Sequence, residues 1–363
     1  MKKILAITLV LLMLLGVVAC GNGDAKDTDG TPDTTDTPET MVGTNDATEN
    51  SDDTTKNPDE ITNPDLEIDI TVIAGTTGMG FAQMMDANSN GSARFKYNFD
   101  IVSDASLASG AIISGEADMA AVPTNLAAVL YNKTTGGVQV VAVNTLGVLY
   151  LLSSGPELAS PEDLAGKTIY CCNQGANPEY ISKYLLEANG FEVGKDVMLD
   201  FTYNSPDELA TAIATGKVEF AVLPEPKVTA VMTQNPDVKT VLSLEDVWSQ
   251  VSGGTSLVQG CLVARKEFIE SNKAELDAFL SDYAASIDFV NADPAAASQI
   301  IAANGIIPKA PLAQKAIPNC NIAYLDGADM QVAMDAFFRV LFAANPASVG
   351  GKLPDAGLYY IAQ

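Results

Sequence analysis

Two stretches of the chain, ISGEADMAAVP at residues 113–123 and ATGKVEFAVLP at residues 214–224, have nearly the same pattern. In each, a glycine follows a helical segment, a short polar step with an acidic residue comes next, and an apolar run ends at proline. Gly115 and Gly216 suit a left-handed helix end because glycine has no Cβ. The apolar runs are short and continuous, as in parallel strands covered by helices on both faces. Helix-to-strand junctions look alike in many α/β proteins, but the pair predicts two similar α/β units.

Serine residues mark the start of the helix in each unit. Ser103 and Ser205 are predicted N-caps, and Ser205-Pro206-Asp207-Glu208 is a full capping box with proline at the first helical position. Two polar turns, at residues 75–80 and 173–176, each follow an apolar strand and open a helix. Such turns present free backbone N–H groups at the positive end of a helix. The turn at 75–80 has neither the P-loop nor the dinucleotide pattern, and a plain glycine turn is the alternative.

The first 20 residues are typical of an export signal. Lys2 and Lys3 precede an apolar run that ends at Val18, and Ala19 comes before Cys20. The run is short for a membrane-spanning helix, which is the alternative. Val17-Val18-Ala19-Cys20 resembles a bacterial lipobox, with valine where leucine is more usual. By that resemblance, Cys20 is the lipidated N-terminus of the mature protein.

Residues 21–67 are predicted to be a disordered tether. They contain 14 acidic and 2 basic residues among Thr, Pro, Asn and Gly, with almost nothing apolar to bury. Residues 68–363 still have a net charge of −16, so nucleic acid is a poor partner. About 300 residues are enough for two lobes with separate cores.

The composition also narrows the chemistry. The chain has no histidine, which excludes histidine-based general bases, proton shuttles and metal sites. The four cysteines after Cys20 lack the spacing of a disulfide framework or a zinc site, so burial is their expected role. Cys171 and Cys172 are adjacent in a predicted strand, so their side chains should point to opposite faces. No cofactor, metal or catalytic residue is predicted.

Several segments together resemble the substrate-binding lipoproteins of ABC importers, in particular the group for nitrate, sulfonate, taurine and thiamine-pyrimidine precursors. The segments are residues 114–123, 159–169, 222–226, 265–268 and 290–294. The resemblance implies an α/β type II periplasmic-binding-protein fold with a central cleft and two crossovers, near residues 144–152 and 254–261. Lobe I would comprise residues 68–147 and 256–363, and lobe II residues 148–255.

The same resemblance implies which loops contact the ligand. In this chain, the resemblance implies that the ligand contacts are Thr76, Thr77, Gly78, Met79, Thr124 and Asn125 in lobe I, and Asn173, Gln174, Gly175, Ala176 and Glu225 in lobe II. Backbone N–H groups and hydroxyls would bind polar ligand atoms, and Met79 with Phe81 would supply an apolar face. Valine at Gly78 or Gly175 should then abolish binding with little effect on the melting temperature.

None of these loops contains Lys or Arg, which favours a neutral or amino-bearing heterocycle over a sulfonate. Glu225 could accept a hydrogen bond from an amino group of the ligand. Alternatively, its negative charge could simply complement the positive dipole end at a helix start. The resemblance implies a monomer on the extracytoplasmic face of the cell membrane, working with an ABC permease and an ATPase. Two alternatives are a sensory lipoprotein of the same fold and an enzyme. A pyrimidine-synthase relative relies on histidine, which this chain lacks.

Overall fold

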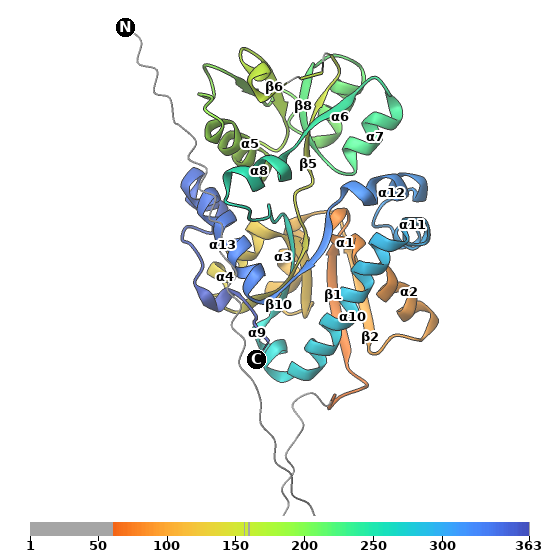
Figure 1. The fold of residues 1–363 in the computed structure, drawn as a ribbon. Helices are drawn as coiled ribbons and strands as arrows, with labels where there is room; N and C mark the ends of the chain where they lie inside the picture. Colours follow the sequence, from red (N-terminus) through yellow and green to blue (C-terminus); the bar gives the residue numbers. More distant parts are fainter. Residues whose placement is uncertain (1–60, 156, 159, 363) are drawn as a thin grey trace, which may run out of the picture. The chain divides into compact units, whose positions relative to one another are not determined.

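The structure is a computed structural model that describes residues 61–155, 157–158 and 160–362. Its strands form two sheets, drawn in Figure 1. We call the first sheet and its helices lobe I. Its strands, in spatial order, are β2 (Lys96–Val102), β1 (Glu67–Ile73), β3 (Met119–Pro123), β10 (Gly260–Arg265), β4 (Val138–Thr145) and β11 (Ile322–Leu325). The second sheet defines lobe II, with β7 (Met198–Asp200), β6 (Thr168–Cys171), β8 (Phe220–Pro224), β5 (Leu149–Ser153) and β9 (Lys239–Ser243).

The two repeated stretches occupy equivalent places in the two sheets. β3 pairs in parallel with β1 and antiparallel with β10, while β8 pairs in parallel with β6 and antiparallel with β5. The parallel character is therefore confirmed on one side of each strand only. The preceding glycines have the predicted left-handed backbone, with φ of 81° at Gly115 and 71° at Gly216.

The chain passes between the sheets twice within the described residues. The first crossover joins β4 to β5, and the second leads from α8 (Leu244–Val251) to β10. β5 and β10 each enter their new sheet antiparallel to the repeated strand. Two α/β sheets joined in this way confirm the predicted type II architecture.

The helices begin largely where the sequence predicts. In lobe I they include α1 (Thr76–Met79), α2 (Ala82–Asn90), α3 (Ala105–Ser114), α4 (Thr124–Lys133), α9 (Lys266–Ser271), α10 (Lys273–Ala292), α11 (Pro294–Ala303), α12 (Ala310–Ala316) and α13 (Gly327–Ala344); in lobe II, α5 (Asn177–Ala188), α6 (Pro206–Ala214), α7 (Lys227–Gln234) and α8. The capping box of Ser205 and Glu208 is confirmed. The expected cap at Ser103 is wrong: the carboxylate of Asp104 accepts from the first turn of α3 instead.

Helix α13 connects the cores of the two lobes. One hydrophobic cluster contains Val140 of β4, Leu151 of β5 and Phe337 of α13. Trp248 of α8 is fully buried in that cluster, and its ring lies 6.0 Å from that of Phe337. The sheets are thus separate, but their cores are continuous through α8 and α13.

The described cysteines have the predicted environment. Cys171, Cys172, Cys261 and Cys320 are all free and buried. Cys171 belongs to the cluster that includes Trp248, whereas Cys172 belongs to a separate cluster around Leu209. Their side chains therefore do point to opposite faces of the lobe II sheet.

The folded part starts earlier than the sequence predicts. The backbone N–H groups of Thr62 and Asn63 both donate to Oε1 of Glu275, at 2.8 Å each, and Ile61 packs against the lobe I core. The prediction of disorder up to residue 67 is therefore wrong for residues 61–67, because α10 supplies a buried acceptor. The predicted signal peptide, Cys20 and residues 21–60 lie outside the described residues. No helix in the described part of the chain is long and apolar enough to cross a bilayer.

Candidate functional site

The polar turns after β1, β3, β6 and β8 stand at the carboxyl ends of strands in both lobes. In open α/β sheets this edge is where ligands bind. Loops from opposite lobes meet directly: Nδ2 of Asn177, at the start of α5, donates to Oδ1 of Asn125, at the start of α4, over 3.2 Å. The structure therefore brings the second and third predicted loops together.

Two polar atoms lie buried at this meeting point without hydrogen-bond partners: Oγ1 of Thr124 and Oδ1 of Asn177. Thr124 is fully buried, and the polar group beside it is the thiol of Cys261, a weak hydrogen-bonding group. Buried polar atoms are nearly always hydrogen-bonded, so two buried atoms without partners at the starts of facing helices are unusual. Asn177 was missed from the sequence, although it directly follows the predicted loop.

The turn after β1 presents fewer groups than expected. Thr76 and Thr77 are half-buried, and their N–H groups stand in the first turn of α1, where no helical acceptor is available. Met79 and Phe81 are fully buried, and Phe81 stacks on Tyr283 with ring centroids 4.4 Å apart. The predicted apolar face from these two residues is wrong, because the turn directs both side chains into the lobe I core.

The backbone N–H groups of the turn after β6 already have hydrogen-bond acceptors within lobe II. The N–H groups of Asn173 and Gln174 donate to Asn204, and that of Gly175 donates to the carboxylate of Glu179 at 2.6 Å. Ala176 donates to the carbonyl of Asn173. The expectation of free N–H donors in residues 173–176 is therefore wrong, since Asn204 and Glu179 occupy the donors of the first three residues.

Glu225 is buried at the end of β8, only 4% exposed. Its carboxylate accepts from the N–H and hydroxyl of Thr229, at 3.2 and 2.9 Å. Burial raises the pKa of Glu225 to about 7, against the lowering effect of hydrogen bonds from Thr229 and Asn319. Asn319 belongs to lobe I, and its carbonyl accepts from the Tyr150 hydroxyl of β5 at 2.7 Å. Glu225 therefore lies at a second contact between the lobes, which no sequence pattern indicated.

The two glycines singled out in the turns differ in surroundings. A Cβ on Gly78 would lie 2.7 Å from Cγ1 of Val72, whereas one on Gly175 would meet nothing within 4 Å. Gly175 has a φ of 81°, which strains any other residue. The expectation that valine at either position leaves the melting temperature unchanged is therefore wrong.

Gly260 of β10 is packed against the turn after β1. A Cβ there would lie 2.6 Å from Cγ2 of Thr77 and 2.7 Å from Oδ1 of Asn144. Gly260→Ala is expected to lower the free energy of unfolding by about 1–3 kcal/mol through overpacking, measured by urea denaturation. Gly110→Ala is the matched control: it is in open space within α3 and should raise that free energy by about 0.5–1 kcal/mol. Equal effects of the two changes would contradict this packing.

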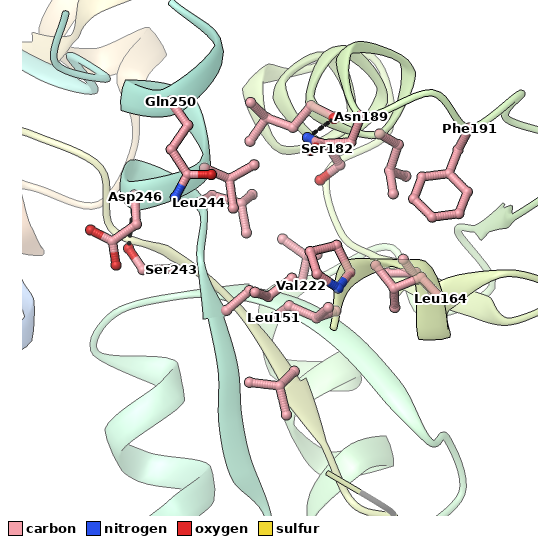
Figure 2. A pocket seen from close by; sticks show the side chains of 17 residues that line it. Leu151, Leu164, Ser182, Asn189, Phe191, Val222, Ser243, Leu244, Asp246 and Gln250 are labelled. Atoms are coloured by element: carbon pink, nitrogen blue, oxygen red, sulfur yellow. Dashed lines mark hydrogen bonds between the residues drawn. The ribbon is translucent and has the colours of Figure 1, made fainter. Parts of the chain in front are cut away.

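A separate cavity of about 330 Å³ lies within lobe II (Figure 2). It is bounded by α5, α8 and one face of the sheet, with Leu151, Leu164 and Val222 among its apolar walls. Ser182, Asn189 and Gln250 contribute polar groups. None of the predicted binding residues lines it, so it is distinct from the loops between the lobes.

The two sheets, the crossovers and the facing loops define a type II periplasmic-binding-protein fold. Solved structures agree. The crystal structure of an ABC transporter from Parabacteroides distasonis is similar to this chain, with 26% identity and a TM-score of 0.68, over 82% of this chain and 100% of its own. The aliphatic sulphonate binding protein SsuA from Escherichia coli has 14% identity and a TM-score of 0.61, covering 82% and 94%.

The nitrate-binding protein NrtA from Synechocystis PCC 6803 has 12% identity and a TM-score of 0.54, covering 77% of this chain and 82% of its own. No curated protein matches the chain in sequence. The chain belongs to the NMT1/THI5 like family, whose model matches residues 98–297, more than half of its length. It is thus homologous to the solute-binding components of ABC importers, as its sequence suggested.

Proposed function

We propose that this chain is the extracytoplasmic solute receptor of an ABC importer. A lipid on Cys20 would hold it at the cell membrane, and it would bind a small organic ligand between the lobes and deliver it to the permease and its ATPase. The observation that carries this proposal is the pair of buried, unpartnered atoms, Thr124 Oγ1 and Asn177 Oδ1, where α4 meets α5. Family membership and the binding-protein neighbours support it.

Lobe rotation gives these atoms their role. Both atoms are buried where Asn177 bonds Asn125 across the lobes, so opening the lobes about the crossovers would expose them to a ligand. Closure around the ligand would supply the partners that they lack and form the surface that a permease recognises. Catalysis has less support: the chain has no histidine, and the burial of Cys171 and Cys172 raises the pKa of both thiols.

The charges around the loops favour a neutral or amino-bearing heterocycle. Two carboxylates stand there, Glu225 after β8 and Glu179 at the start of α5. The Glu179 carboxylate already accepts from Gly175, in the place where an anionic ligand group would bind a helix end. A sulfonate would therefore face a carboxylate instead of a free donor.

Native mass spectrometry tests the binding function. The full-length protein is purified in detergent without refolding and compared with the same sample after denaturation. Release of a small organic molecule in a one-to-one ratio is the expected result, and its mass would identify the solute class. A protein that arrives empty, and that is not stabilised by pyrimidines, sulfonates or amino-bearing heterocycles in thermal-shift assays, would refute the proposal.

Thr124→Val is expected to separate binding from stability. Valine has the same shape, and the hydroxyl has only the weakly hydrogen-bonding thiol of Cys261 beside it, so the free energy of unfolding should stay level or rise by up to about 1 kcal/mol. The affinity for the released solute should fall about tenfold or more, measured by calorimetry. Thr211→Val, in α6 away from the loops, is the control and should leave affinity unchanged. Unaltered affinity in Thr124→Val would place the ligand elsewhere.

A further inference from the structure

The side chain of Glu245, in the first turn of α8, contacts both crossovers. Its Oε2 accepts from the N–H of Gly147 at 2.9 Å and from the N–H of Leu257 at 3.1 Å. Gly147 lies between β4 and β5, in the first crossover, and Leu257 lies between α8 and β10, in the second. One carboxylate thus bonds both connections between the lobes, with charge-assisted hydrogen bonds.

The contact requires a glycine in the first crossover. A Cβ on Gly147 would lie 2.6 Å from Oε2 of Glu245 and 2.8 Å from its Cβ. The carbonyl of Gly147 in turn accepts from Nδ2 of Asn321, so the N–H and the C=O of Gly147 are both hydrogen-bonded. The next residue, Val148, donates to Oε1 of Gln259 at 2.7 Å, which again joins the first crossover to the second. The crossovers are therefore close together and bonded side by side.

Helix α8 is itself held in place. Trp248, three residues after Glu245, packs against Tyr184 of α5 and Phe337 of α13. Ser243 caps the helix by accepting from Asp246. Helix α8 therefore holds Glu245 in a fixed position next to the two crossovers.

We propose that Glu245 is the positioning residue of the hinge: its carboxylate clamps the two crossovers so that they bend together when the lobes open. This inference rests on the proposed lobe closure around a ligand. Both oxygens of the carboxylate lie within 3.3 Å of the Leu257 nitrogen, and Oε2 also bonds the N–H of Gly147. Because one carboxylate bonds both N–H groups, a movement of one crossover that shifts the carboxylate also disturbs its bond to the other. The lobes then rotate as two bodies about one axis instead of separating at each crossover independently.

Hydrogen–deuterium exchange of the ligand-free, full-length protein tests the clamp. In Glu245→Gln, the amides around Gly147 and Leu257 should exchange about tenfold faster or more, at both crossovers together, because the side chain retains one acceptor and loses its charge. Amides of β3 and β8 should keep their rates. Asp246→Asn, the exposed neighbouring acid with no crossover partner, is the matched control and should change neither crossover.

Acceleration at one crossover alone would overturn the proposal, and so would acceleration spread over all strands, which would indicate a general loss of stability. If Glu245→Gln does not fold, Gly147→Ala displaces the same carboxylate from the opposite side and should give the same paired acceleration. The exchange experiment uses no ligand, so it tests the Glu245 clamp alone. The proposed binding function is tested separately by native mass spectrometry, and either proposal can fail without the other.

Discussion

As the pH rises from about 4.5 to about 7, the free energy of unfolding of the wild-type protein is expected to fall by about 3 kcal/mol more than that of Glu225→Gln. Burial raises the pKa of Glu225 from 4.5 to about 7. Across this window the unfolded chain releases the proton while the folded protein retains it, so stability falls with rising pH. Urea denaturation of both proteins at several pH values measures the difference, in which contributions of the other acidic groups cancel.

The neighbouring threonine provides a control for this prediction. Thr229→Val removes the hydroxyl that donates to Glu225 at 2.9 Å, and with it one interaction that lowers the pKa. The pH at which stability levels off should therefore move upward in this variant. A flat difference between wild type and Glu225→Gln across the window would show that Glu225 is ionised in the folded protein without cost.

The same titration bears on the ligand. An amino-bearing ligand that bonds the Glu225 carboxylate would favour its ionised form. Binding would then release a proton near neutral pH, and affinity would rise with pH. A neutral ligand that accepts a hydrogen bond from the protonated acid would have the opposite dependence.

Trp248→Ala is expected to lower the free energy of unfolding by about 3–5 kcal/mol, the second large effect. Trp248 is the only tryptophan in the chain, is fully buried, and fills the space between α5, α8 and α13. Removing its ring leaves a cavity where the cores of the two lobes meet. Urea denaturation followed by circular dichroism measures the loss, since the variant has no tryptophan fluorescence.

Trp248→Phe separates packing from hydrogen bonding at the same position. Phenylalanine keeps most of the ring but loses the bond from Nε1 to Oγ1 of Thr255, which is 3.3 Å long. A loss of about 1–2 kcal/mol is expected, well below that of alanine. Equal losses for the two variants would mean that the hydrogen bond, and not the packing of α8 against α13, dominates.

Features that depend on neighbouring residues could be predicted from the sequence. The left-handed glycines at 115 and 216, the capping box at Ser205 and the two crossovers are all set by local pattern or by the resemblance. The satisfied turn after β6 had a local signal too, because Glu179 lies four residues after Gly175 and points its carboxylate back to the helix start. An acid at this spacing can take up the N–H of Gly175, which the prediction of free donors did not include.

Features that depend on distant residues could not be predicted in this way. Thr62 and Glu275 are 213 positions apart, and Tyr150 and Asn319 are 169 apart. No periodicity links such pairs, since only the folded chain brings them together. The role of α13 between the lobes is of the same kind: its apolar stripe indicates burial, but not against which lobe.

The four buried thiols have a consequence for a protein that works outside the cytoplasm, as proposed here. Burial raises the pKa of Cys172 to about 11 and that of Cys261 to about 12, and the thiolate is the form that oxidants attack. The native domain should therefore be inert toward the oxidants and disulfide catalysts of that compartment. A chain that unfolds or stalls during export exposes all four thiols at once and becomes open to mixed disulfides. Oxidation would then mark misfolded copies selectively and leave working receptors untouched.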